Sequence, residues 1–175
     1  MLANELSFEV DRRPFLLRPD RPAEGEARRL FDGETETELN PDMQERAKGV
    51  GLVMHRPQWS PNTMRVHEAT VYAKEKEKDG EFHHLAAAAY WESSADLNNL
   101  DVLKGIVEGA GMDWGELGPR IESGQYRDAV MSEYEAAKEK GVGGTPTYMI
   151  GGELHRGDVS IDDLRTAIQS ASSPG

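Results

Sequence analysis

Between residues 141 and 152 the chain reads Gly-Val-Gly-Gly-Thr-Pro-Thr-Tyr-Met-Ile-Gly-Gly, and this stretch restricts the fold most. Residues 147–150 are rich in side chains that favour strands. Gly151 and Gly152 are typical of a two-residue hairpin turn, and residues 153–156 are the expected partner strand. Because a lone hairpin is barely stable in water, this unit requires further strands or a helix packed against it.

The rest of the sequence predicts one more strand and a long helical stretch. Residues 6–11 alternate apolar and polar side chains, the period of a half-buried strand. Residues 21–38 predict an exposed loop with one helical turn around 27–31. Start and stop signals then predict helices that begin at Asn40-Pro41, after Ser60-Pro-Asn62, near Phe82 once Gly80 has broken the run, at Asn99 or Asp101, at Trp114, near Tyr126 and at Ser160.

These elements predict an α/β fold in which the strand at residues 6–11 and the hairpin share one mixed sheet. The sheet portion would comprise residues 1–39 and 141–175, and residues 40–140 would be a helical insertion that covers it. A chain of 175 residues is long enough for one domain with an insertion. We therefore expect a single compact domain overall.

Acidic residues outnumber basic ones, with 32 Asp and Glu against 20 Lys and Arg, for a net charge of −12. Binding to nucleic acid and docking on anionic membranes both need clustered Lys and Arg, so we expect neither partner. The simplest consequence of the acidity is solubility. No run resembles a membrane span or a signal peptide, and the expected location is the cytoplasm.

The chain contains no cysteine. This excludes disulfides, thiolate metal sites and a thiol nucleophile within these residues. Histidine spacing does not favour a metal either. His83 and His84 are adjacent, so on a helix they point about 100° apart, and neither His55 nor His155 stands at a ligand spacing from them. We predict no metal site.

Four segments together resemble the DsbA-like branch of the thioredoxin superfamily, in particular the group of FrnE and 2-hydroxychromene-2-carboxylate isomerase. They are Arg13-Pro-Phe-Leu-Leu-Arg-Pro-Asp20, Ser60-Pro-Asn-Thr63 with His67, Gly141-Val-Gly-Gly-Thr-Pro-Thr147, and Gly157-Asp158 followed by Leu164. Each match is short, but the four occur in the family's order and span nearly the whole chain. The resemblance implies a truncated thioredoxin-like fold and a cis peptide bond between Thr145 and Pro146.

That family performs thiol–disulfide exchange with a Cys-x-x-Cys pair at the start of a helix that follows a central strand. Residues 6–11 resemble the family's second strand, so the catalytic strand, motif and helix have no counterpart in this sequence. By resemblance the chain is a redox-inactive relative, because the dithiol that would carry the electrons is absent. Loss of the central strand would leave open sheet edges, and we expect a homodimer to bury them.

The loop at Gly144, Thr145 and Pro146 is the main candidate ligand site. By resemblance, this loop pairs its backbone with an extended thiol, peptide or glutathione-like ligand. The alternative is that Pro146 only shapes the entry to the hairpin. Asp158 is a second candidate, since in glutathione-using relatives an acidic turn here meets the amino group of the tripeptide; an ordinary loop position is the alternative. Glutathione is open by resemblance alone, and we expect no other cofactor.

Asn62 and His67 are the remaining candidates. In isomerase-like relatives the residue that matches Asn62 lies near the ligand, but its sequence context also suits a helix cap. His67 is a candidate general base, because its ordinary pKa lies near neutrality. On an apolar helix face, a hydrogen-bonded core histidine is the alternative.

Three functions stay open from the sequence. The first is a truncated or split oxidoreductase whose catalytic segment lies upstream or on another chain. The second is a non-catalytic protein that binds a peptide or small ligand in the cis-proline groove, or takes part in assembly. The third is a glutathione-dependent, isomerase-like protein that uses His67, Asn62 and Asp158.

Overall fold

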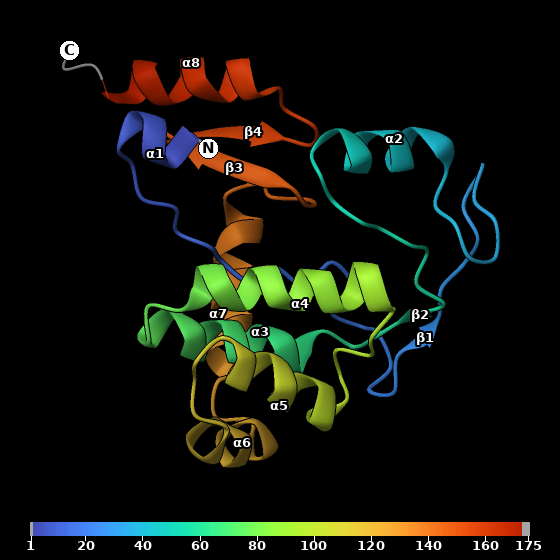
Figure 1. The fold of residues 1–175 in the computed structure, drawn as a ribbon. Helices are drawn as coiled ribbons and strands as arrows, with labels where there is room; N and C mark the ends of the chain where they lie inside the picture. The colour runs from blue at the N-terminus through green and yellow to red at the C-terminus, as the bar shows by residue number, and fades with distance from the viewer. Residues whose placement is uncertain (1, 173–175) are drawn as a thin grey trace. The chain divides into compact units, whose positions relative to one another are not determined.

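The structure is a computed structural model and describes residues 2–172 (Figure 1). The elements are α1 (Leu2–Leu6), β1 (Glu26–Ala27), α2 (Pro41–Gly49), β2 (Trp59–Ser60), α3 (Met64–Glu75), α4 (Asp79–Ser93), α5 (Leu100–Gly109), α6 (Trp114–Ser123), α7 (Arg127–Glu139), β3 (Thr147–Ile150), β4 (Glu153–Arg156) and α8 (Ile161–Ser172). The expected α/β class with a large helical part is confirmed.

The contacts group the chain into two compact units. One comprises Met1–Leu17 and Ser132–Gly175 and is called the hairpin unit; the other comprises Arg18–Met131 and is called the helical unit. Residues 18–39, expected with the sheet, group with the helices because β1 pairs with β2. Residues 132–140, expected with the helices, group with the hairpin.

The hairpin unit is built on the antiparallel pair β3 and β4. Its register joins Thr147 to Arg156 and Ile150 to Glu153 across the Gly151–Gly152 turn, which confirms the predicted hairpin. Both glycines have positive φ angles, as such a turn requires. Helix α8 packs against β3 and also against α1, and Arg165 Nε donates to Glu5 Oε1 at 2.8 Å.

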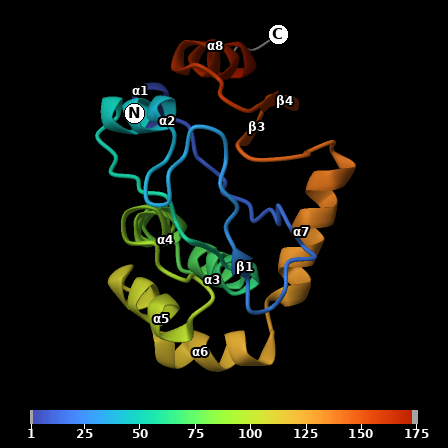
Figure 2. The same ribbon diagram turned by 90° about the vertical axis from the view of Figure 1, so that its right-hand side faces the viewer.

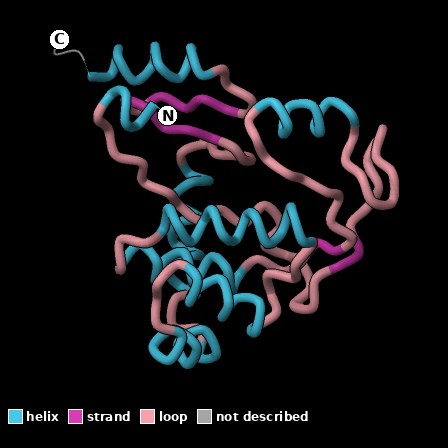
Figure 3. Tube along the Cα trace, in the orientation of Figure 1, coloured by secondary structure: helices cyan, strands magenta, loops and turns pink. Residues whose placement is uncertain are grey.

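The predicted strand at residues 6–11 is wrong. Residues 2–6 form helix α1, and residues 8–16 run as a loop (Figure 3). Alternation makes a strand only where a neighbouring strand accepts its hydrogen bonds, and within the described part of the chain the sheets are β1 with β2 and β3 with β4. The sheet expected to join residues 6–11 to the hairpin is therefore not formed there.

In the helical unit, α3 packs against α4 and α6, and α5 packs against α4 and α6 (Figures 1 and 2). Apolar side chains from all four helices meet in one core. Its fully buried large members are Tyr72, Phe82, Leu103, Val107 and Leu117. This core holds nearly all the deeply buried apolar side chains that the structure describes, so the helical unit is the well-packed part.

Two predicted helix starts are confirmed by their caps. The Asn40 side chain accepts from Met43 N at 2.9 Å, and that of Asn99 accepts from Asp101 N at 2.8 Å. The predicted break at Gly80 is wrong: Gly80 lies in the first turn of α4, and the chain reverses at Glu77, which has a φ of 56°. The helical turn expected around residues 27–31 is also absent, because strand β1 occupies its start.

A buried ion-pair network holds the loop before α2. The two terminal guanidinium nitrogens of Arg28, Nη1 and Nη2, each donate to a carboxylate oxygen of Glu34 at 2.8 Å. Phe31 N donates to the same carboxylate at 3.1 Å. Arg56 Nε lies 3.4 Å from Glu34 Oε2, and its Nη2 donates to the carbonyl of Arg28 at 2.7 Å. The side chains of Glu34 and Arg56 are each 3% exposed. Arg28 is the main cause that lowers the pKa of Glu34 to about 2.

Glu68 on α3 is buried in a different way. Its side chain is 0% exposed, and neither carboxylate oxygen has a hydrogen-bond partner. Arg127 Nε lies 3.9 Å away on a side chain that is 60% exposed. Burial raises the pKa of Glu68 above its ordinary value of 4.5.

Within residues 2–172, no helix is long and apolar enough to cross a membrane.

Glu34→Gln should lower the free energy of unfolding by about 3 kcal/mol, because it leaves two buried guanidinium groups short of their counter-charge. The wild-type pKa is depressed, so its stabilising effect is present above pH 4.5 and is lost as the pH falls toward 2. Urea unfolding across this pH range should therefore show that the free energy of unfolding falls less at acidic pH in the variant than in the wild type. Glu36→Gln, two residues away with an exposed side chain, is the control and should match the wild type.

Glu68→Gln should raise stability at neutral pH by about 1–3 kcal/mol, because it removes a fully buried charge whose ion pair with the largely exposed Arg127 is long and lacks a hydrogen bond. The folded-state pKa is raised, so the wild type loses stability as the pH rises above 4.5. Thermal unfolding should show a gain that shrinks as the pH falls to 4.5. An equal gain at every pH would contradict the assignment, and exposed Glu122→Gln is the matched control.

Candidate functional site

The hairpin unit encloses a cavity of about 720 Å³, called here the β3 groove. Strand β3 forms one wall, residues 8–11 line another part of it, and α7 and α8 contribute the remainder. Its apolar lining includes Phe8, Val10, Phe15, Met149, Leu164 and Ile168. The volume lies in the range of ordinary ligand pockets.

The β3 groove exists because the hairpin unit has almost no core of its own. Among the described residues of this unit, only Pro14 and Leu16 are buried apolar side chains. Helix α8 has no buried residue, although its apolar face includes Leu164 and Ile168. Apolar side chains of this unit are therefore left half-covered around an open space.

Charges at the edge of the β3 groove are largely balanced. Arg13 Nε donates to Asp11 at 2.8 Å and its Nη1 to Glu133 at 3.3 Å. These carboxylates hold the pKa of Arg13 above its ordinary value, chiefly through Asp11. Glu9 and Lys140, of opposite sign, also line the groove. An uncharged occupant therefore suits the groove best.

The loop at Gly144, Thr145 and Pro146 borders the groove at the start of β3. Gly144 and Thr145 line it, and the peptide bond between Thr145 and Pro146 is cis. Thr147 Oγ1 donates to the Gly144 carbonyl at 2.7 Å, and Gly157 N donates to the Pro146 carbonyl at 2.9 Å. The loop is thus fixed by bonds to β3 and to the end of β4.

Strand β3 presents its outer edge to the groove. In a two-residue hairpin, Ile150 and Glu153 flank the turn and form two backbone hydrogen bonds with each other. Along β3, every second residue from Ile150 likewise directs its backbone N–H and C=O groups toward β4. The bond between Gly157 N and the Pro146 carbonyl continues this pattern. The backbone groups of Thr147 and Met149 therefore point away from β4. Among described residues, β3 pairs with β4 alone.

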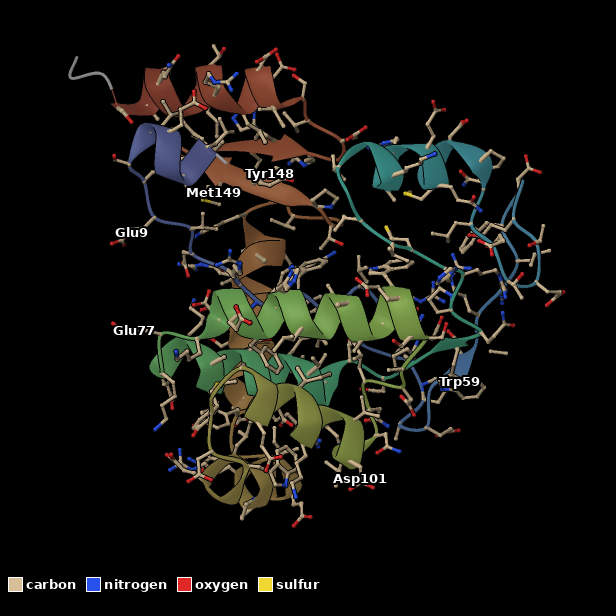
Figure 4. The ribbon with its side chains drawn as sticks, viewed as in Figure 1. Glu9, Trp59, Glu77, Asp101, Tyr148 and Met149 are labelled. Atoms are coloured by element: carbon tan, nitrogen blue, oxygen red, sulfur yellow. The ribbon has the colours of Figure 1, made fainter. Side chains whose placement is uncertain are left out.

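Tyr148 and Met149 are 39% and 48% exposed on this strand (Figure 4). Both line the groove together with Thr147 and Ile150. Four consecutive residues of β3 border the groove. Successive side chains of a strand point to opposite faces, so contacts made by side chains alone would involve only every second residue. We infer that the groove meets the backbone edge of β3 as well as its side chains.

Asp158 also belongs to the hairpin unit, where it follows β4 at an exposed turn. It does not line the groove. Asn62 and His67 belong to the helical unit. The Asn62 amide nitrogen donates to the Arg21 carbonyl at 2.8 Å, and its oxygen accepts from Met64 N at 2.9 Å. Both polar ends of Asn62 thus hold local structure at the start of α3.

His67 is partly buried on α3. Burial, with a smaller effect of nearby His83, lowers the pKa of His67 to about 4. The imidazole is therefore neutral at physiological pH and is a weak proton acceptor. Across residues 2–172, no three histidine or acidic side chains gather closely enough to hold a metal ion.

The family model of the DSBA-like thioredoxin domain matches residues 1–169. The chain belongs to the DSBA-like thioredoxin family. It is also similar to the uncharacterized protein YwbO of Bacillus subtilis (strain 168), with 24% identity over 163 residues, 91% of this chain and 80% of that protein. This DSBA-like chain has a cis peptide bond before Pro146 and contains no cysteine.

The sequence pointed to Gly144 and Thr145 of this DSBA-like chain, and both border the β3 groove. It did not point to Phe8, Val10, Leu164 or Ile168 as walls of the same space. Their apolar spacing predicts core packing instead.

Thr147→Val should loosen the loop before β3, because it removes the hydroxyl that donates to Gly144 while keeping the β-branched shape. The expected loss of stability is about 1 kcal/mol, with faster amide exchange across residues 141–145. Thr147→Ser retains the donor and should stay close to the wild type. Equal behaviour of the two variants would contradict a role for this bond.

Proposed function

We propose that this chain is a redox-inactive DSBA-like protein that binds an extended peptide segment or a small apolar ligand in the β3 groove. The β3 groove itself is the observation that carries the proposal. It combines an apolar cavity of about 720 Å³ with strand β3 and with Gly144 and Thr145 of the loop before that strand; Pro146 does not line the cavity. Such a combination suits binding through backbone hydrogen bonds together with apolar side-chain contacts.

The absence of cysteine supports binding over thiol chemistry. Thiol–disulfide exchange needs a thiolate that attacks and a second sulfur that resolves the mixed disulfide, and this chain supplies neither. Purified protein should therefore not accelerate the reduction of insulin by dithiothreitol. Reduction above the uncatalysed rate would overturn the redox-inactive assignment.

Isomerase-like chemistry at His67 is less well supported. A general base works best with a pKa near the working pH, and the pKa of His67 is lowered to about 4. Asn62 uses both ends of its amide in local bonds. A homodimer that covers the β3 edge remains an alternative proposal, and its test is the oligomeric state in solution.

The two adjacent glycines of the loop allow a matched test of binding. A Cβ atom added at Gly143 or Gly144 would meet nothing within 4 Å, and neither glycine has a positive φ. Gly144 lines the groove and Gly143 does not. Gly144→Leu should therefore narrow the groove, whereas Gly143→Leu should leave it open.

Binding is measured with an apolar fluorescent probe, 8-anilinonaphthalene-1-sulfonate, followed by a library of fluorescein-labelled peptides. We expect saturable binding that Gly144→Leu weakens about tenfold, equal to about 1.4 kcal/mol, and that Gly143→Leu leaves unchanged. Thermal unfolding of both variants checks that each is folded. Equal effects of the two substitutions would place the ligand elsewhere and reject the proposal.

A further inference from the structure

The helical unit exposes large apolar side chains around the start of α2. Leu30 and Phe31, adjacent on the loop before this helix, are 52% and 60% exposed, and Met43 in its first turn is 39% exposed. A Cβ atom at Gly33 would lie 3.2 Å from Asn40 Cβ, so the loop touches the helix start (Figure 1). Large apolar side chains gathered on one exposed surface commonly mark an interaction site.

Buried bonds hold the loop that carries Leu30 and Phe31. Phe31 N donates to the Glu34 carboxylate at 3.1 Å, and Glu34 N donates to the Phe31 carbonyl at 3.1 Å. The Arg28 guanidinium lies 5.0 Å from the centre of the Phe31 ring and also binds Glu34. Buried Arg56 donates to the carbonyls of residues 28 and 36. Because the backbone is already ordered, a partner that covers these side chains would cost little conformational entropy.

Acidic side chains accompany these apolar ones. Between residues 30 and 45 the chain has six acidic residues and no Lys, Arg or His. Glu34 is neutralised by two arginines. Four others are exposed: Asp32, Glu36, Asp42 and Glu45. These four acids, with Leu30, Phe31 and Met43, are called the 30–45 surface. Its complement is a partner that offers apolar side chains together with Lys or Arg.

We propose that the 30–45 surface docks a basic amphipathic helix of another protein. The apolar face of that helix covers Leu30 and Phe31, and its Lys or Arg side chains pair with Asp32 and Glu36. An amphipathic helix suits the surface because it presents an apolar stripe with charged residues beside it. The 30–45 surface belongs to the helical unit and the β3 groove to the hairpin unit, so this interaction is separate from the proposed ligand binding.

Charge favours another protein over a second copy of this chain. Each copy carries a net charge of −12, so two copies repel one another. Two 30–45 surfaces that faced each other would also bring like charges together, whereas a basic helix would neutralise them.

The test uses the full chain and a fluorescein-labelled peptide, Leu-Lys-Lys-Leu-Leu-Lys-Leu-Leu-Lys-Lys-Leu-Leu-Lys-Leu-amide, whose leucines recur with the period of a helix. One control peptide has Glu in place of every Lys, and a second has Ala in place of every Leu. Affinity is measured by fluorescence anisotropy. We expect the basic amphipathic peptide to bind more tightly than either control.

The apolar contact is tested at Phe31. Phe31→Gln should weaken binding of the basic peptide about tenfold, whereas Phe31→Leu stays apolar and should keep most of the affinity. Ile161→Gln is the matched control, because Ile161 is 62% exposed on the hairpin unit and does not line the β3 groove. It should leave binding unchanged. Thermal unfolding checks that each variant is folded.

The charge contact is tested by the double variant Asp32→Lys with Glu36→Lys, which should also weaken binding about tenfold. Added NaCl should weaken binding more in the wild type than in this variant, because salt screens the lost attraction. Glu122→Lys with Glu135→Lys changes the net charge equally at exposed positions elsewhere, and should weaken binding by about twofold at most.

Four other results would overturn the inference. Equal losses in the two double variants would show attraction by net charge alone. Equal losses for Phe31→Gln and Ile161→Gln, or a loss with Gly144→Leu but none with Phe31→Gln, would place the peptide elsewhere. A dimer that Phe31→Gln dissociates in sedimentation would make a second copy the occupant. Absence of peptide binding would reject the docking surface while leaving the β3 groove untouched.

Discussion

The architecture of the hairpin unit depends on one constraint: among the described residues, strand β3 pairs with β4 alone. A strand that pairs on one side alone cannot hold a sheet together, and the apolar faces that would pack on that sheet remain half-covered. Residues 8–11, α7 and α8 then surround an open groove rather than a core. The same half-covered apolar side chains therefore form both the sparse core of the hairpin unit and the walls of the candidate binding site.

The helical unit shows the opposite situation. Its helices bury Tyr72, Phe82 and Leu117 completely, and its loop before α2 is held by Glu34 between two arginines. Removal of one partner from a buried ion pair of this kind is strongly destabilising, because it leaves the other charges uncompensated. Glu68 is the exception, a buried carboxylate without a hydrogen-bond partner, and its raised pKa reflects that cost.

This chain belongs to the DSBA-like family and contains no cysteine, the residue that would exchange a disulfide. The loop at Gly144–Pro146 lies beside a groove, but no residue can exchange a disulfide there. One fold commonly hosts several different functions, because the scaffold and the reacting groups are different residues.

Local signals in the sequence determined the caps at Asn40 and Asn99, the Gly151–Gly152 hairpin and the terminal helix, because each depends on neighbours within a few residues. They also directed attention to Gly144 and Thr145. The fate of residues 6–11 was decided by tertiary structure, since an alternating pattern becomes a strand only beside a partner. Local signals also missed β1, where a helical turn was expected. Strand β1 forms by pairing with β2, which lies more than thirty residues away in the sequence. The β3 groove arose from the same physical cause: whether an apolar face is buried depends on what lies opposite it.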